Sequence, residues 1–260
     1  MPRAHRHFVA GQIWHITQRC HRRQFLLRFA VDRRRWLYWL FQARRRYGLS
    51  VLNYVVTSNH VHLLVHDHGN NAIADAMQLL SGRTAQEYNR RLDRHGAFWE
   101  DRYHATAVET ERHLARCIVY IDMNMVRAGA VAHPEQWSAG GYYETQHPRR
   151  RGARIDHPRL RELLGFDTHL QLQRARRTWV DERIASQADA RDPVWTESVA
   201  VGSLDYTLMM RRALALSNPG REPVPEADGW SLREEGARYR ARRLIGGQGE
   251  GMLPTGAMTA

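Results

Sequence analysis

Two histidines separated by a single residue, His60 and His62, are the feature of this sequence best suited to chemistry. They lie in the segment 58–65, where apolar residues alternate in the pattern of a β-strand. Successive side chains on a strand point to opposite faces, so both imidazoles point from the same face. Two imidazoles on one face can converge on a metal ion. Two histidines on a half-buried strand are the alternative interpretation, and the motif therefore requires partners elsewhere in the chain.

The pattern predicts a helix over residues 111–128, and this helix supplies candidate partners. Its predicted buried stripe consists of Leu114, Ile118, Ile121 and Met125. Tyr120 and Asn124 lie together on the flank of that stripe, one turn apart. A tyrosine in that place would have its ring supported by the core and its hydroxyl exposed. An ordinary amphipathic tyrosine at the margin of a core fits the same pattern.

Taken together, these segments resemble the REP-associated tyrosine transposases of the single-tyrosine HUH superfamily, which carry an IS200-like transposase domain. Residues 120–129 read Tyr-Ile-Asp-Met-Asn-Met-Val-Arg-Ala-Gly and are similar to the family segment Tyr-Ile-x-x-Asn-Pro-Val-Arg-Ala-Gly, with Met125 in place of the usual proline. The strand with His60 and His62 looks like the HUH motif, and residues 98–103 look like the family's Trp-x-x-Arg-Tyr element. The resemblance covers residues 8–140, and residues 194–203 are similar to C-terminal extensions of some members.

The resemblance implies a role for each of these residues. Tyr120 would be the nucleophile, and His60, His62 and Asn124 would hold a divalent metal, Mg²⁺ or Mn²⁺, although imidazole would also suit Zn²⁺. Attack on a phosphodiester would leave a 5′-phosphotyrosine and a 3′ hydroxyl, so the strand could be rejoined without ATP. Such enzymes act on single-stranded DNA folded into imperfect, repetitive palindromic hairpins.

The charge of the chain independently indicates a nucleic-acid partner. All 39 basic residues are arginines, the net charge is +12 and the sequence pI is about 10.5. Arginine presents a planar fork of donors that suits phosphate oxygens and stacks on bases. An anionic membrane is the alternative partner, but no apolar run reaches ~18 residues and no signal peptide is present. The candidate DNA contacts are Arg3, Arg6, Arg22, Arg23, Trp99, Arg102 and Arg127.

Only two cysteines, Cys20 and Cys117, occur in the chain. Their number and separation exclude a zinc ribbon and a disulfide framework. We expect a cytoplasmic, nucleoid-associated protein that works as a monomer or homodimer. His66 and His68 are predicted to lie at the rim of the site without binding metal. His15 could face the site, but core packing is the favoured interpretation.

The order of predicted elements is strand, helix, strand, strand, helix, strand, helix. Asp32 and Thr110 are the predicted N-caps of the first and last helices, and Gly48 ends the first. This order indicates an α+β fold: a ferredoxin-like antiparallel sheet covered by helices on one face. We predict a catalytic domain over residues 1–147, a basic helical C-terminal extension over 148–245 and a disordered tail over 246–260.

Two other functions fit parts of this pattern. The first is a domesticated, non-catalytic protein that binds hairpins of single-stranded DNA or RNA. The presence of both histidines, Tyr120 and Asn124 argues against it. The second is a relaxase or replication initiator with the same His-x-His pair. Their motifs run in a different order or carry a third histidine, and the sequence has neither feature.

Overall fold

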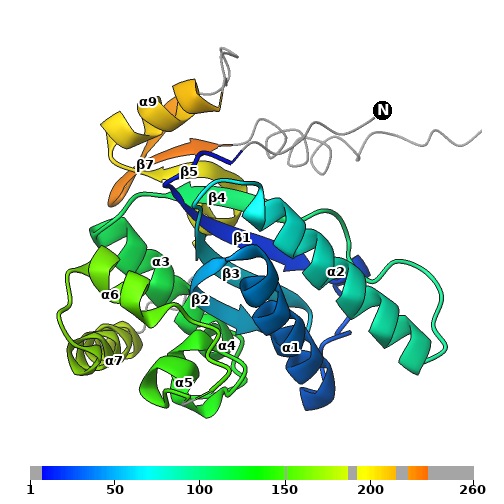
Figure 1. The fold of residues 1–260 in the computed structure, drawn as a ribbon. Coiled ribbons are helices and arrows are strands. Elements are labelled where there is room, and N and C mark those ends of the chain that lie inside the picture. The colour runs from blue at the N-terminus through cyan, green and yellow to red at the C-terminus, as the bar shows by residue number, and fades with distance from the viewer. Residues whose placement is uncertain (1–7, 150, 187–191, 215–221, 234–260) are drawn as a thin grey trace, which may run out of the picture.

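A seven-stranded sheet organises the computed structural model, which describes residues 8–149, 151–186, 192–214 and 222–233. The strands lie side by side in the order β2-β3-β1-β4-β5-β7-β6 (Figure 1). Their bounds are β1 Ile13–Arg19, β2 Ser50–Val56, β3 His60–His66, β4 His104–Val108, β5 Ser198–Gly202, β6 Pro223–Glu226 and β7 Gly229–Arg233. The first four form the predicted ferredoxin-like antiparallel unit, and the predicted α+β class is confirmed.

Nine helices accompany the sheet within the described ranges. They are α1 Ala30–Tyr47, α2 Ala72–Arg91, α3 Arg112–Asp122, α4 Asn124–Arg127, α5 Gly141–Gln146, α6 His157–Leu164, α7 His169–Ala185, α8 Val194–Glu197 and α9 Leu204–Ala213. Single turns of 3₁₀ helix lie at His21–Arg23 and Pro134–Gln136. The order of elements from β1 to α3 is the one predicted.

The helices cover both faces of the sheet, so the expectation of one covered face is wrong. His15 and Gln18 lie three residues apart on β1 and therefore point to opposite faces. The His15 ring contacts Tyr120 of α3, whereas the Gln18 side chain accepts a hydrogen bond from Ser81 of α2. Accordingly, α1 and α2 lie on one side of the sheet and α3, α6 and α7 on the other (Figure 1).

The extension over residues 148–245 contains strands as well as the helices that were predicted for it. It contributes β5, β6 and β7, and β5 pairs with β4 in parallel, with Ala107 opposite Ala200. The edge of β4 would otherwise present unpaired backbone groups, which an added strand satisfies. The sheet thus continues from the predicted catalytic domain into the extension. The predicted tail lies outside the described residues.

The helix predicted over 111–128 is broken. It ends at Asp122, and α4 begins at Asn124, with Met123 between them at φ −73° and ψ −1°. The predicted stripe is nevertheless buried, because Leu114, Ile118, Ile121 and Met125 are each at most 4% exposed. The break therefore separates Tyr120 and Asn124 into two helices without exposing the core between them.

Two of the predicted helix starts are displaced. Glu111 takes the N-cap position that was assigned to Thr110, at φ 57°. Asp32 lies inside the first turn of α1 and pairs with Arg91 of α2, because the helix begins two residues earlier. Gly48 ends α1 in the left-handed conformation, at φ 66°, as predicted.

The core lies between the sheet and the helices on each face. Cys20 and Cys117 are both buried there as free thiols. Across the described residues, no helix is long and apolar enough to cross a membrane.

Candidate functional site

The register of β1 and β3 assembles a histidine cluster on the face that α3 covers. Thr17 pairs with His62 and His15 with Leu64, so His15 is a diagonal neighbour of His62 on the same face. The His15 and His62 rings are stacked, with centroids 5.1 Å apart and planes 10° apart. His62 is 2% exposed and His15 is 0% exposed. His60, one step along the strand, is half-buried at the mouth of the cluster.

Asn124 joins both predicted histidine ligands. Its Oδ1 lies 3.1 Å from His60 Nε2, and its Nδ2 lies 2.9 Å from His62 Nε2. The helix α4 places this amide directly opposite the His60–His62 strand. The structure therefore brings together the three side chains that the resemblance named, although Asn124 lies 62 residues after His62 in the chain.

A chain of hydrogen bonds sets the tautomer of His62. His15 Nδ1 lies 2.9 Å from the Trp195 carbonyl oxygen, which can only accept, so this nitrogen carries the proton. Burial is the main cause that lowers the pKa of His15 to about 3, so the ring is neutral and its Nε2 is an acceptor. His62 Nδ1, 2.9 Å away, must then donate. Burial also lowers the pKa of His62 well below its ordinary value, which leaves its Nε2 with a lone pair directed at Asn124.

The hydrogen bonds of Asn59 favour one tautomer of His60, the one with its proton on Nδ1. Asn59 Nδ2 donates to the Arg23 carbonyl at 3.2 Å, so its Oδ1 is the atom that accepts from His60 Nδ1 at 2.7 Å. In a neutral His60 the Nε2 lone pair then faces the Oδ1 lone pair of Asn124 at 3.1 Å. Two acceptors in that position repel each other unless a positive charge, either a proton or a metal ion, lies between them.

The two imidazole nitrogens and the Asn124 oxygen fit a divalent metal, because a cation between His60 and Asn124 would remove the repulsion of their lone pairs. Two imidazole nitrogens and an amide oxygen are the ligand types that borderline and hard cations accept. Three protein ligands leave coordination positions open for substrate oxygens. Within the described residues, no group of three or more His, Cys, Asp or Glu side chains is arranged as a metal site. A metal bound here would take the Asn124 amide as its third protein ligand, as the resemblance implies, and His15 contacts His62 through the His62 Nδ1 atom, which faces away from Asn124.

Tyr120 lies against this cluster. Its ring makes edge contacts with His15 and His62, at centroid distances of 6.0 and 5.8 Å. The guanidinium of Arg127 lies 4.3 Å from the ring centroid, and Trp195 lies 6.1 Å away. The ring is supported as predicted, but only 8% of the residue is exposed, because Arg127 and Trp195 cover what the sequence pattern left open.

Sequence reasoning missed the roles of two residues, His15 and Trp195, although residues 194–203 were noted as similar to C-terminal extensions of some family members. Core packing was the favoured interpretation of His15, and the structure instead places it in hydrogen-bonding contact with His62. The only available signal was its position on the first strand, with the right parity for the same face. Trp195 acts through its backbone carbonyl, which no residue pattern could reveal. His66 and His68, predicted to lie at the rim of the site, contact each other at the far end of β3, away from His60.

The residues predicted to contact DNA differ in how exposed they are. Arg22, Arg23 and Arg102 are exposed. Trp99 is half-buried, and its indole donates to the Ser81 carbonyl at 3.0 Å. Arg127 donates to the Tyr120 carbonyl at 2.8 Å and belongs to the histidine–tyrosine cluster. Arg3 and Arg6 lie outside the described residues.

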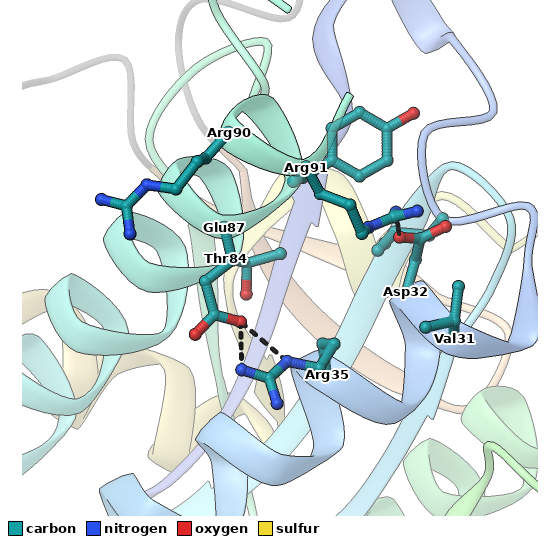
Figure 2. Close-up of a pocket in the computed structure, with 9 residues that line it drawn as sticks. Val31, Asp32, Arg35, Thr84, Glu87, Arg90 and Arg91 are labelled. Atoms are coloured by element: carbon teal, nitrogen blue, oxygen red, sulfur yellow. Dashed lines mark hydrogen bonds and ion pairs between the residues drawn. The ribbon is translucent and has the colours of Figure 1, made fainter. Parts of the chain in front are cut away.

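A separate hollow of about 400 Å³ lies between α1 and α2, on the face opposite the histidines (Figure 2). Its arginines are largely engaged within the protein. Arg35 pairs with Glu87 at 2.7 Å, and Arg91 pairs with Asp32. These ion pairs engage Arg35 and Arg91, two of the three arginines that line the hollow.

Comparison with known families assigns the segment that carries the cluster. Residues 9–124 match the family model described as transposase, IS200-like. The chain carries an IS200-like transposase domain. The match begins at Val9 and ends at Asn124. It therefore contains the candidate site residues His60, His62, Tyr120 and Asn124. Trp195 and the whole extension lie beyond it.

Two solved structures are similar to this chain. One is a REP-associated tyrosine transposase bound to a REP hairpin, with 17% identity, a TM-score of 0.47 and coverage of 57% of this chain and 87% of that one. The other is a putative transposase from Deinococcus radiodurans R1, with 19% identity, a TM-score of 0.34 and coverage of 45% and 92%. No curated protein matches the sequence.

Proposed function

We propose that this transposase cleaves and rejoins single-stranded hairpin DNA in a metal-dependent reaction, with Tyr120 as the nucleophile. The observation that carries the proposal is the convergence of His60 Nε2, His62 Nε2 and the Asn124 amide, with the Tyr120 ring packed against the same histidines. The hairpin substrate follows from the family resemblance of the sequence motifs and from the net charge of +12.

His60, His62 and Asn124 would hold the divalent cation, Mg²⁺ or Mn²⁺. Bound there, it would act as a Lewis acid toward a phosphate oxygen. The protein supplies the rest of the chemistry. The hydrogen bonds of His15 to the Trp195 carbonyl and of His60 to Asn59 would hold both rings with Nε2 directed toward Asn124 and open to the cation.

In the proposed reaction the Tyr120 oxygen attacks the phosphorus of a phosphodiester. The phenol loses its proton, an oxygen–phosphorus bond forms, and the bond from phosphorus to the 3′ oxygen breaks. The 3′ oxygen takes up a proton and leaves as a hydroxyl, and the 5′ phosphate stays on the tyrosine. Arg127, whose guanidinium lies 4.3 Å from the ring centroid, would stabilise negative charge on the tyrosine as its proton is lost.

Covalent capture of labelled DNA tests this proposal. The full chain is incubated with end-labelled single-stranded hairpins from its host genome, with Mn²⁺ or with a chelator, and the products are resolved on a denaturing gel. We expect a slowly migrating adduct with Mn²⁺ that is lost in Tyr120→Phe and in His60→Ala. Tyr38→Phe is the matched control, because Tyr38 is 43% exposed on α1, on the opposite face.

Two outcomes would contradict the proposal. An adduct that persists in Tyr120→Phe would exclude this residue as the nucleophile. Tight hairpin binding without any adduct, in every divalent metal tested, would favour the non-catalytic binding protein instead.

A further inference from the structure

The segment between β1 and α1, residues 20–29, exposes two aromatic rings beside the histidine cluster. Phe25 is 65% exposed and Phe29 is 56% exposed, which makes them the most exposed large hydrophobic residues in the described part of the chain. A single exposed apolar residue is ordinary, but two within five residues beside a candidate active site form a defined surface. We call residues 20–29 the aromatic loop.

The aromatic loop is anchored, so its rings are held outward. Leu26 and Leu27, between the two phenylalanines, are 8% and 0% exposed. The Leu27 amide donates to the Ser58 carbonyl at 2.9 Å, and the Arg28 amide donates to the Phe25 carbonyl at 3.1 Å. The buried leucines thus fix the backbone from which the two phenylalanines project. A surface that is held in place before binding loses little conformational entropy when a ligand binds.

The loop is also directly connected to the candidate metal ligand. Asn59 donates to the Arg23 carbonyl at 3.2 Å and accepts from His60 at 2.7 Å, so one amide joins the loop to the cluster. The Cys20 amide donates to the Asn59 carbonyl at 2.8 Å at the start of the loop. A ligand bound at the Arg23 end of the aromatic loop would therefore lie close to the proposed reaction centre.

The charge of the loop identifies an anionic ligand. The segment 20–29 contains His21, Arg22, Arg23 and Arg28 and no acidic residue. Within the described ranges, no carboxylate pairs with its three arginines. Arg35 and Arg91 of the hollow in Figure 2 are, by contrast, paired with Glu87 and Asp32. Within the loop, the Arg28 guanidinium lies 4.9 Å from the Phe29 ring centroid, and it can accompany a base on that ring, whereas two arginines of the hollow are held by carboxylates.

We propose that the aromatic loop is a stacking surface for unpaired bases of a single-stranded nucleic acid, with Phe25 and Phe29 as the stacking residues. Exposed aromatic rings interleaved with arginines are the combination that holds bases and phosphates of a single strand. A duplex presents no unstacked base to these rings, so the surface selects single strands. This inference rests on the proposed function for its substrate and adds the residues that would recognise it.

Binding measurements on the full chain, in a fixed low-salt buffer with a chelator, test the stacking surface. Fluorescence anisotropy compares a short labelled single strand, the same strand with abasic sites and a duplex of the same length. We expect Phe25→Leu and Phe29→Leu each to weaken binding of the single strand by about 5- to 150-fold and to leave duplex binding unchanged. Phe25→Trp should retain affinity, because it keeps an aromatic face.

The substitution by leucine separates stacking from general apolar contact, since it keeps an apolar side chain of similar size. Leu170→Ala is the surface control, because Leu170 is 53% exposed on α7, remote in sequence from the loop. The abasic strand should bind the wild type and Phe25→Leu equally. Wild-type affinity in the double Phe25→Leu/Phe29→Leu variant, or an equal loss for single strand and duplex, would overturn the proposal.

Two further readouts separate this proposal from its alternatives. Sedimentation of both leucine variants should match that of the wild type; loss of a dimer would show instead that the loop binds a second copy of the chain. At saturating DNA and with Mn²⁺, the leucine variants should still form the covalent adduct. Base-dependent binding without an adduct in the wild type would contradict the proposed catalysis and leave the stacking surface standing.

Discussion

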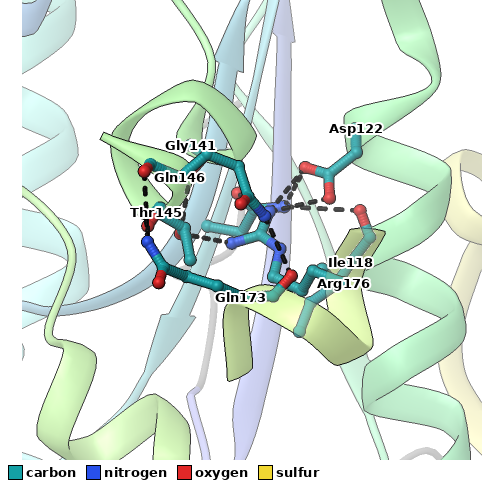
Figure 3. A network of polar contacts seen from close by, with 8 residues as sticks. Ile118, Asp122, Gly141, Thr145, Gln146, Gln173 and Arg176 are labelled. Atoms are coloured by element: carbon teal, nitrogen blue, oxygen red, sulfur yellow. Dashed lines mark hydrogen bonds and ion pairs between the residues drawn. The ribbon is translucent and has the colours of Figure 1, made fainter. Parts of the chain in front are cut away.

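Two buried polar networks meet the segment from α3 to α4, and they differ in how completely their atoms are satisfied. In the network of Figure 3, both oxygens of Asp122 accept from Arg176 Nη2 at 2.7 Å, and Asn53 donates to Oδ1 at 2.9 Å. Arg176 also donates to Thr145 at 2.6 Å, and only its Nε lacks a partner among the described residues. In the histidine cluster, His60 Nε2 lies 3.1 Å from Asn124 Oδ1, and both atoms are acceptors when His60 is neutral and donates from Nδ1 to Asn59.

This difference separates a structural network from a candidate site. A buried ion pair whose hydrogen bonds are made within the protein has little left to offer a ligand. A cluster with more acceptors than donors requires an added positive charge. Both networks also join the extension to the transposase domain, one through the Arg176 side chain of α7 and the other through the Trp195 carbonyl of α8.

Removing the Arg176 charge is expected to have the largest effect on folding. Arg176→Met would leave Asp122 buried without its partner, and this should lower the free energy of unfolding by about 3–5 kcal/mol. Denaturant unfolding measures the change. Arg177→Met on the exposed side of α7 is the matched control and should change stability by less than about 0.5 kcal/mol. Equal stability of the two variants would show that the ion pair does not hold the extension in place.

Substitution of His15 should have an intermediate effect that appears in metal binding. His15→Leu removes the acceptor for His62 Nδ1, so His62 would no longer be held in the tautomer that binds metal. We expect Mn²⁺ affinity to fall by about 10- to 100-fold, as measured by calorimetric titration of the full chain. His15→Gln keeps one donor and one acceptor and should retain more of the affinity. Unchanged affinity in His15→Leu would show that the tautomer is set in another way.

Between pH 7 and 6, the dependence of stability on pH is the smallest expected effect, and it grows as the pH falls further. The folded-state pKa of His15 is lowered to about 3, chiefly by burial, whereas the unfolded chain takes up this proton near pH 6.5. Stability is therefore complete above pH 6.5 and falls as the pH drops toward 3, by about 1.4 kcal/mol per pH unit for this group. His157, with a pKa of about 4 that is also lowered mainly by burial, adds to the same trend.

Denaturant unfolding at pH 7, 6 and 5 tests this prediction. In His15→Leu the slope between pH 6 and 5 should be smaller than in the wild type, while Arg177→Met should keep the wild-type slope. A wild-type stability that rises on acidification would contradict the burial of neutral histidines in the cluster.

Local patterns were sufficient for the elements of the transposase domain. Alternation located β1 to β4, the apolar stripe located α3, and Gly48 marked the end of α1. The family resemblance also selected His60, His62 and Asn124 as a group, and the structure brings their side chains together. Each of these predictions depends on residues within one or two elements, which is where sequence periodicity carries information.

The predictions that were wrong depend on contacts between distant segments. No glycine or proline stands at Met123 to indicate that the helix breaks there. The adjacent Asp122 is bound by Asn53 and Arg176, which are distant in the sequence. The strands of the extension form because β4 offers an edge, and the covering of Tyr120 depends on Trp195. Tertiary contacts of this kind override local propensity and leave no local signal.

The acceptor that orients His15 is a main-chain oxygen, and this affects how the site can be studied. Any amino acid at position 195 supplies the same carbonyl, so a scan of single substitutions there would report only on the indole. The contact is instead sensitive to the path of the backbone: a shift in the register of β5 against β4, or an inserted residue in α8, would move the oxygen. Insertions and deletions near residue 195 are therefore the genetic changes that would expose its contribution.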